Sequence, residues 1–178
     1  MRKALVILAA LAMAGPADAA LPVGARAPDF VTTGALGGKA FRLNLKHELR
    51  KGPVVLYFYP KAFTQGCTLE AHAFSEAAGD FKKAGAQVVG MSADDLPTLK
   101  RFSVEACRNA FPVATAAPGT IKAYDVALPV VNRVTPMTNR TSYVIDRNGR
   151  VAFVHSDLNW SEHVTKTLAA VRKLRVTR

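Results

Sequence analysis

One cysteine, Cys67, lies in the part of the sequence best suited to chemistry. An apolar run at residues 53–59 leads into a turn that contains Pro60 and Gly66, and a helix is expected to begin at the cysteine. The first turn of a helix offers free backbone N–H groups and the positive end of the helix dipole, which both stabilise a thiolate. Thr64 brings a hydroxyl to the same turn. The pattern therefore indicates a nucleophilic cysteine.

The spacing Pro-x-x-x-Thr-x-x-Cys, formed by Pro60, Thr64 and Cys67, resembles the active-site signature of peroxiredoxins. Tyr-Pro-Lys before the turn and Gly-Cys-Thr-x-Glu after it resemble the bacterioferritin comigratory protein (PrxQ) branch, and the resemblance covers residues 24–174. It implies a thioredoxin-like fold and a thiol-dependent peroxidase that reduces hydrogen peroxide or small organic hydroperoxides. It implies no cofactor, and electrons would come from a thioredoxin-like protein or another thiol reductant.

The resemblance also implies roles for the residues of this turn. Cys67 would attack the peroxide and become a sulfenic acid. Thr64 would bind the attacked peroxide through its hydroxyl, and Pro60 would fix the turn and shield the sulfur from water.

Two further residues of the implied site lie beyond the turn. Residues 139–146 match a family segment in which an arginine precedes a strand, and this match assigns Arg140. A guanidinium keeps its charge and offers several fixed donors, so it can stabilise both the thiolate and the transition state. Glu70, three residues past Cys67, matches the acidic residue that orients the arginine.

Each of these residues also has an ordinary structural explanation. Cys67 can be read as a buried structural thiol and Thr64 as a helix N-cap. Arg140 can be read as a surface charge, and Glu70 as an acid favoured by the dipole of the first helical turn. The occurrence of all four at the family spacing favours the catalytic interpretation.

Cys107 is the second of two cysteines and the candidate resolving thiol. Many PrxQ-type proteins carry this thiol five residues after the peroxidatic one, where this chain has His72, expected to be an exposed helix residue. Other members place it in the later helix, and we expect Cys107 near the C-terminal end of that helix. A small buried hydrophobe is the alternative. We favour an intramolecular Cys67–Cys107 disulfide that forms after local unwinding, because the two thiols are expected to be too far apart otherwise.

Two other functions compete with the peroxidase. An exported thioredoxin-like oxidoreductase would use Cys-x-x-Cys, but the second position holds Glu70, and the position of its usual proline holds Arg140. A non-catalytic domain with a static Cys67–Cys107 disulfide is the other alternative. No metal, nucleotide or haem site is expected, since the remaining histidines show no metal-ligand spacing: His47, His155 and His163.

The elements that must position these residues alternate between strand and helix. We expect strands at residues 30–32, 40–43, 53–59, 87–91, 111–115, 142–145 and 151–155, and helices at 68–84, 96–109, 120–124 and 162–174. Asn148-Gly149 predicts a hairpin between the last two strands. The pattern alone indicates an α/β fold, and the resemblance specifies a thioredoxin-like fold with a central mixed sheet flanked by helices.

Local signals add detail to these elements. The Gly-rich residues 34–38 are expected to form a turn, and Asp94 or Asp95 is expected to cap the helix at 96–109. Three apolar residues of the helix at 68–84 are expected to face the core: Leu69, Ala73 and Phe81.

The first 19 residues have the features of a secretory signal peptide. Arg2 and Lys3 precede an uncharged, mostly apolar stretch at residues 4–15, and residues 17–19 form a small-x-small cleavage site. The apolar stretch is too short to span a bilayer, so no stable membrane insertion is expected after its removal. We therefore expect a signal peptide at 1–19, a single domain at 20–178 and a periplasmic location.

The chain carries a formal net charge of +11. Its basic residues are scattered, and the densest cluster lies in the short tail at 172–178. We interpret the charge as a solvated basic surface and expect no nucleic-acid partner. The resemblance to PrxQ-type proteins, which are often monomers, predicts a monomer.

Overall fold

The computed structural model describes residues 20–128 and 137–176. The expected signal peptide at 1–19 and its cleavage site lie outside the described residues. Within the described ranges, no helix is both long and apolar enough to cross a bilayer.

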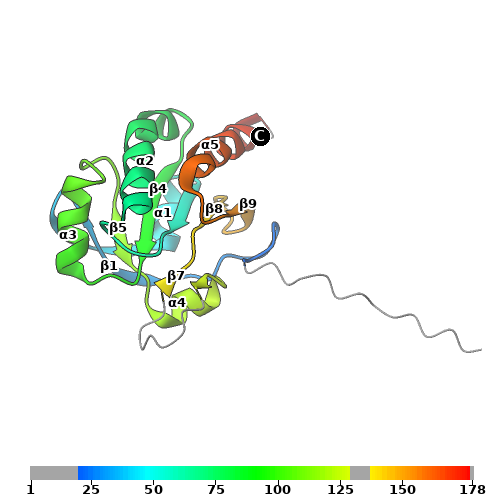
Figure 1. Ribbon diagram of the computed structural model, residues 1–178. Helices are drawn as coiled ribbons and strands as arrows, with labels where there is room; N and C mark the ends of the chain where they lie inside the picture. Colours follow the sequence, from blue (N-terminus) through cyan, green and yellow to red (C-terminus); the bar gives the residue numbers. More distant parts are fainter. Residues whose placement is uncertain (1–19, 129–136, 177–178) are drawn as a thin grey trace, which may run out of the picture.

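A seven-stranded mixed sheet forms the centre of the protein, in the order β2-β1-β5-β4-β3-β8-β9 (Figure 1). β3 pairs in parallel with β4 and antiparallel with β8. The strands of this sheet are β1 (Val31–Leu36), β2 (Lys39–Asn44), β3 (Val54–Phe58), β4 (Gln87–Ser92), β5 (Val113–Thr115), β8 (Thr141–Ile145) and β9 (Val151–Ser156). A small two-stranded sheet joins β6 (Ala127–Leu128) to β7 (Met137–Thr138).

Helices cover both faces of the sheet. The core on one face contains residues of α2 (Gln65–Lys83), α3 (Leu96–Glu105) and α5 (His163–Val176). The core on the other face contains residues of α1 (Leu45–Lys51) and α4 (Pro118–Ala123). A short 3₁₀ helix, η1 (Trp160–Glu162), leads directly into α5. The thioredoxin-like α/β fold is therefore confirmed.

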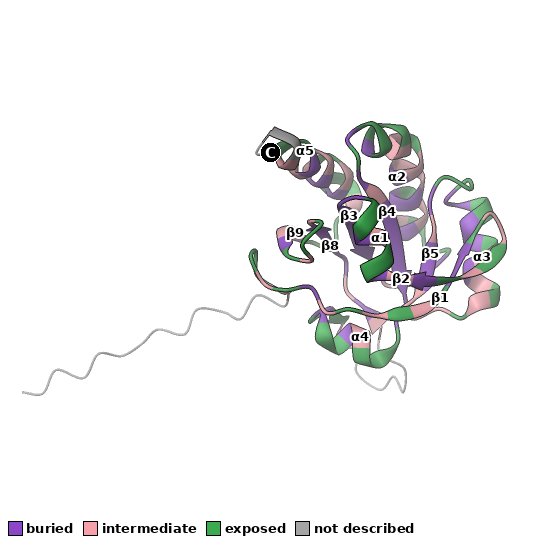
Figure 2. Ribbon diagram, turned by 180° about the vertical axis from the view of Figure 1, so that it is seen from behind, coloured by how far each residue is buried: buried purple, intermediate pink, exposed green. Residues whose placement is uncertain are grey.

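β3 is the strand on which the two cores meet. All five of its residues are buried, as expected for an apolar run with helices on both sides (Figure 2). Because side chains alternate along a strand, Val55 and Tyr57 enter the core beneath α2, whereas Leu56 and Phe58 enter the core beneath α1. The prediction of a buried central strand at 53–59 is confirmed, and this strand delivers the chain to the turn before Cys67.

Several local expectations were wrong. Leu69 is 41% exposed, because α2 begins at Gln65 and buries a face that runs through Cys67, Ala71 and Phe74 instead. His72, expected to be exposed, is half-buried on the same helix.

The region near β1 and β2 also departs from the expected pattern. Gly34 belongs to β1, and the turn itself consists of Gly37 and Gly38, which both have positive φ. α1 was not anticipated, although Asn44 gives the signal by accepting a hydrogen bond from the His47 amide as N-cap.

α3 ends earlier than the predicted 96–109. Asp95 caps its start by accepting a hydrogen bond from the Thr98 amide. The helix ends at Glu105, and Arg108 and Asn109 then take positive φ angles of 50° and 59°, which no right-handed helix contains.

We predict that Gly90→Ala destabilises the protein. A Cβ at this buried position in β4 would lie 2.9 Å from three atoms of the Tyr57 side chain on the neighbouring strand: Cε1, Cζ and the phenolic oxygen. Overpacking of this kind costs about 1–3 kcal/mol, which urea denaturation would measure as a lower midpoint.

Gly79→Ala is the matched control, since it lies on the exposed surface of α2 with nothing within 4 Å of its Cβ. It should raise the free energy of unfolding by about 0.5–1 kcal/mol, because Ala favours the helix over Gly. Equal stability of Gly90→Ala and wild type would contradict the packing argument.

Candidate active site

The turn that joins β3 to α2 is tied to the sheet by its backbone. The amide of Ala62 donates to Asp94 Oδ2 at 2.7 Å, and Ser92 Oγ donates to the same oxygen at 2.8 Å. Thr138 Oγ1 donates to the carbonyl of Tyr59 at 2.6 Å, just before the turn. These contacts fix the direction in which the chain leaves the sheet.

Phe63, in the same turn, has a φ of +64°. A non-glycine residue in this left-handed region is strained by about 1–2 kcal/mol. Its ring meets the Phe102 ring of α3 edge-on at 5.2 Å, and the Arg101 guanidinium lies 5.0 Å above it. The strained turn is therefore held against α3.

Cys67 lies in the first turn of α2 and is only 1% exposed. The helical hydrogen bonds begin with the Thr68 amide, which donates to the Thr64 carbonyl at 2.9 Å, so the amides of residues 65–67 precede the ladder. Thr64 is the N-cap residue, but its Oγ1 donates to the carbonyl of Lys61 at 2.9 Å and does not cap the helix. Thr64 therefore is the N-cap residue by its position, as the alternative interpretation had it, but its side chain does not cap the helix.

Arg140 supplies the positive charge of the site from the residue before β8. Its Nη2 lies 3.5 Å from Cys67 Sγ, and its Nη1 forms an ion pair with Glu70 Oε2. Nε donates to the carbonyl of Leu158 at 2.8 Å. The guanidinium is 6% exposed, so it is a buried and fixed donor and not a surface charge.

Glu70 is fully buried beneath Arg140. Burial raises the pKa of its carboxyl to about 8, against the opposing attraction of the Arg140 guanidinium. Only one of its oxygens is paired, because Oε1 has no hydrogen-bond partner.

The structure brings three of the predicted residues into direct contact: Cys67, Glu70 and Arg140. Thr64 and the half-buried Pro60 belong to the turn that leads to them. Asp94, the anchor of this turn, was considered only as a helix cap. The Leu158 carbonyl was missed, because nothing in a sequence marks a backbone oxygen as the partner of a distant arginine.

Cys107 occupies a different environment. It is fully buried in the turn that follows α3, so its expected place within the helix was wrong. Burial raises the pKa of its thiol well above the ordinary value. Both cysteines are free thiols and belong to the same buried core as α2 and α3.

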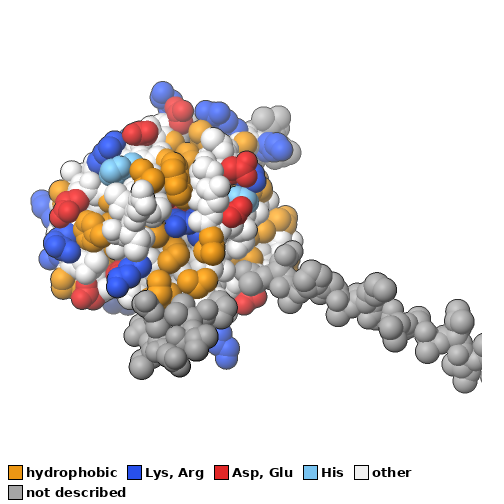
Figure 3. Space-filling view, in the orientation of Figure 1, with side chains coloured by type: hydrophobic (Ala, Val, Ile, Leu, Met, Phe, Trp, Pro, Cys, Tyr) orange, Lys and Arg blue, Asp and Glu red, His pale blue; other side chains and the backbone are white. Residues whose placement is uncertain are grey.

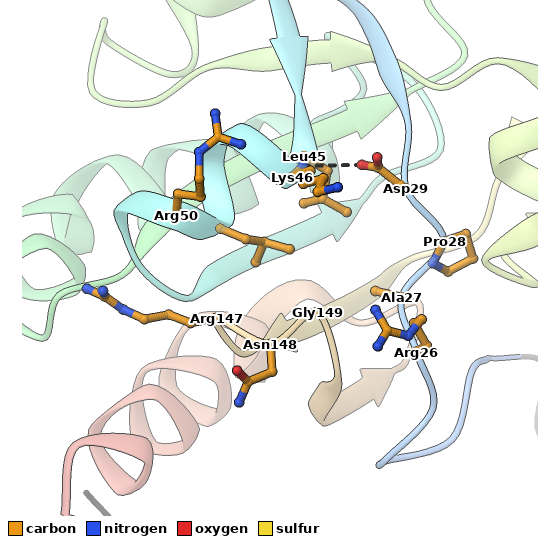
Figure 4. Close-up of a pocket in the computed structure, with 11 residues that line it drawn as sticks. Arg26, Ala27, Pro28, Asp29, Leu45, Lys46, Arg50, Arg147, Asn148 and Gly149 are labelled. Atoms are coloured by element: carbon orange, nitrogen blue, oxygen red, sulfur yellow. Dashed lines mark hydrogen bonds between the residues drawn. The ribbon is translucent and has the colours of Figure 1, made fainter.

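Hydrophobic side chains gather across the middle of the face in Figure 3, while charged ones lie mostly around its edge. Three exposed apolar residues belong to segments of the site: Phe63 in the turn, Leu69 of α2, and Leu158, whose carbonyl holds Arg140. A cavity of about 520 Å³ lies elsewhere, between the segment at 26–29, α1 and the β8–β9 turn (Figure 4). None of the site residues lines it, so it takes no part in the chemistry at Cys67.

Comparisons with known proteins agree on one family. Residues 23–154 match the AhpC/TSA family. A putative peroxiredoxin of Mycobacterium tuberculosis is 36% identical over 129 residues, which cover 71% of this chain and 82% of the relative. The chain belongs to the peroxiredoxin (AhpC/TSA) family. It is therefore a thiol-dependent peroxidase.

Other peroxiredoxins of the PrxQ type are also similar. Chloroplastic peroxiredoxin Q of Oryza sativa subsp. japonica is 32% identical over 152 residues, covering 85% of this chain and 67% of the relative. The crystal structure of peroxidoxin BcpB from Mycobacterium tuberculosis superposes with a TM-score of 0.76 at 33% identity, covering 86% of this chain and 97% of that one.

We predict that Gly66→Ala slows the reaction of this peroxiredoxin with peroxide. The added Cβ would lie 3.2 Å from Arg140 Nη2 and 3.7 Å from Trp160 Cδ1, so the guanidinium must move. Misplacement of a catalytic group by a fraction of an ångström to 1 Å lowers the rate constant by about tenfold to a hundredfold. Stopped-flow measurement of the second-order rate constant would show it.

Gly66→Ala should remain folded, because the gain in helix propensity from Ala, about 1 kcal/mol, offsets the displacement of the Arg140 guanidinium. Gly79→Ala on the same helix is the control and should react at the wild-type rate. A Gly66→Ala protein as fast as wild type would show that the position of Arg140 does not limit the reaction.

Proposed function

We propose that Cys67 is the peroxidatic cysteine of this thiol-dependent peroxidase. The observation that carries the proposal is the 3.5 Å contact between Arg140 Nη2 and Cys67 Sγ in the first turn of α2. A fixed cation and free amides at one sulfur favour the thiolate, which is the nucleophilic form.

In the proposed reaction the Cys67 thiolate attacks one oxygen of the hydroperoxide. The S–O bond forms as the O–O bond breaks, so the sulfur is oxidised to a sulfenic acid. The other oxygen leaves as hydroxide or alkoxide and takes a proton from solvent. The guanidinium of Arg140 and the free amides of the first turn stabilise the developing negative charge.

The remaining residues position the reactants. Thr64 binds the attacked peroxide through its hydroxyl, which must leave the Lys61 carbonyl to do so. Pro60 shapes the turn and limits the access of water. Glu70 orients Arg140 because its Oε2 accepts a hydrogen bond from Arg140 Nη1.

We propose that Cys107 is the resolving cysteine. Its thiol attacks the sulfenic sulfur, the S–S bond forms and water leaves; an external dithiol then reduces the disulfide by exchange. Full burial and a raised thiol pKa prevent this in the folded conformation, so the turn after α3 must open. Arg108, which follows Cys107, takes a left-handed φ of 50° that strains this turn, and strain favours opening.

We also propose that the chain is exported to the periplasm as a monomer, with residues 1–19 as its signal peptide. The support is the charged start, the short apolar stretch and the small-x-small site of the sequence. Fractionation of cells with mass determination of the mature N-terminus tests export, and sedimentation of the mature protein tests the monomer.

We predict that Cys67→Ser abolishes peroxide consumption in the presence of a thiol reductant, whereas Cys107→Ser reacts once and then stalls as a sulfenic acid. Thiol counting and peptide mapping after one equivalent of peroxide should show a Cys67–Cys107 disulfide in wild type only. A sulfenic acid trapped by a dimedone-type reagent should accumulate in Cys107→Ser.

The competing functions give different results in the same measurements. A Cys67→Ser protein as active as wild type would refute the assignment. A disulfide present before peroxide and indifferent to mild reductant would indicate a static scaffold. Insulin reduction at the rate of a thioredoxin would indicate a thiol–disulfide oxidoreductase.

A further inference from the structure

A second buried titratable group, His163, lies next to Glu70. His163 is the first residue of α5 and is fully buried. Its Nδ1 lies 3.7 Å from Glu70 Oε1, the carboxyl oxygen that has no hydrogen-bond partner. Four residues thus form a row of neighbours: Cys67 contacts Arg140, Arg140 contacts Glu70, and Glu70 lies next to His163.

The hydrogen bonds of His163 determine its tautomer. Nε2 lies 2.9 Å from the carbonyl oxygen of Asp157, which can only accept, so Nε2 carries a proton. Nδ1 lies 2.8 Å from Ser142 Oγ, and in the neutral ring it accepts the proton of that hydroxyl. Nδ1 therefore has no proton to donate to Glu70 Oε1, and its single lone pair is taken by the Ser142 hydroxyl. A carboxylate oxygen buried without a donor is costly, and a neutral carboxyl at this place costs less.

The charges around Arg140 also favour a protonated Glu70. One guanidinium contacts two acids, the Cys67 thiol and the Glu70 carboxyl. If both were ionised, this buried cluster would hold two negative charges against one positive charge, which a site without solvent disfavours.

We propose that Glu70 and His163 hold one proton between them, carried by Glu70 near neutral pH, so that the charge of Arg140 remains available to the Cys67 thiolate. His163 is then a positioning residue that acts through Glu70. The proposal rests on the assignment of Cys67 as the peroxidatic cysteine.

The pKa directions of the two groups agree with this placement. Burial raises the pKa of Glu70 to about 8, and burial lowers the pKa of His163 to about 4. Between these values the pair carries one proton, on the carboxyl. As the pH rises through about 8 the pair loses it, and the new carboxylate competes with the thiolate for Arg140.

The other groups around the pair do not supply this titration. Arg140 stays charged at all relevant pH values. The ring of His155 lies 4.6 Å from that of His163, and burial and Lys166 lower its pKa, so it is neutral well below pH 8. The titratable and charged groups that face the pair are Cys67 of α2, Tyr57 of β3, Arg140, His155 of β9 and Asp157, with Lys166 and Glu162 acting on His155.

The kinetic test is the pH dependence of the second-order rate constant for hydrogen peroxide. The rate constant of wild type should fall above about pH 8, and this fall is the alkaline limb of its pH profile. His163→Asn keeps an acceptor for Ser142 and brings an amide N–H that can donate to Glu70 Oε1, which stabilises the carboxylate, so this alkaline limb should move down by about one pH unit. Ser142→Ala is the matched control: it frees Nδ1 for Glu70, so its limb should stay in place or move up.

A second measurement, on carboxyl protonation, does not depend on activity. The infrared difference spectrum between wild type and Glu70→Gln near neutral pH should contain the C=O band of a protonated carboxylic acid, which disappears above the alkaline limb. Nitrogen chemical shifts of His163 in wild type should report the neutral Nε2–H tautomer near neutral pH.

The outcomes separate this proposal from the proposed function. A missing carboxylic acid band, an imidazolium at His163 near neutral pH, or an unshifted limb in His163→Asn would each overturn the shared proton while leaving Cys67 as the nucleophile. A Cys67→Ser protein with full activity would instead overturn the proposed function, even with the carboxylic acid band present.

Discussion

The buried guanidinium of Arg140 is the point on which the candidate active site depends. It contacts the Cys67 sulfur and the Glu70 carboxyl, and the Leu158 carbonyl fixes its third edge. A charge this deeply buried is stable only when its partners are in place. The first two turns of α2, the start of β8 and the segment after β9 must therefore all be folded before the site exists.

The sheet makes this convergence possible. β3 and β8 are neighbours in an antiparallel register that pairs Phe58 with Thr141. The end of β3, which leads into the Cys67 turn, thus lies beside the start of β8, which follows Arg140. Residues 73 apart in the chain meet because two adjacent strands place them at the same edge.

The sequence predicted the parts of this arrangement that are local. The buried run of β3 and the hairpin at Gly149 follow from composition and turn chemistry, and the residues from Pro60 to Glu70 follow from spacing within one turn and one helix. Arg140 was assigned through family resemblance only, since periodicity does not reveal strand pairing.

His163 and Ser142 escaped prediction because His163 meets Glu70 of α2 and Ser142 meets His163, contacts between distant segments that no short-range pattern encodes. The end of α3 was misplaced for a related reason. The helix ends at Glu105 and the backbone turns left-handed at Arg108 and Asn109, but the nearest stop signal in the sequence is Asn109, four residues later than the observed end.

The rings of Phe63 and Phe102 pack against each other and so connect the two segments that carry the cysteines. Phe63 belongs to the turn before Cys67, and Phe102 belongs to the helix that ends just before Cys107. With Cys107 as the resolving thiol, a movement of α3 or of the Phe63 turn that brings the two sulfurs together would separate these rings. Until the disulfide formed, a second peroxide would be able to oxidise the sulfenic acid irreversibly. Contacts between the two segments would then bear on the amount of peroxide that the protein tolerates.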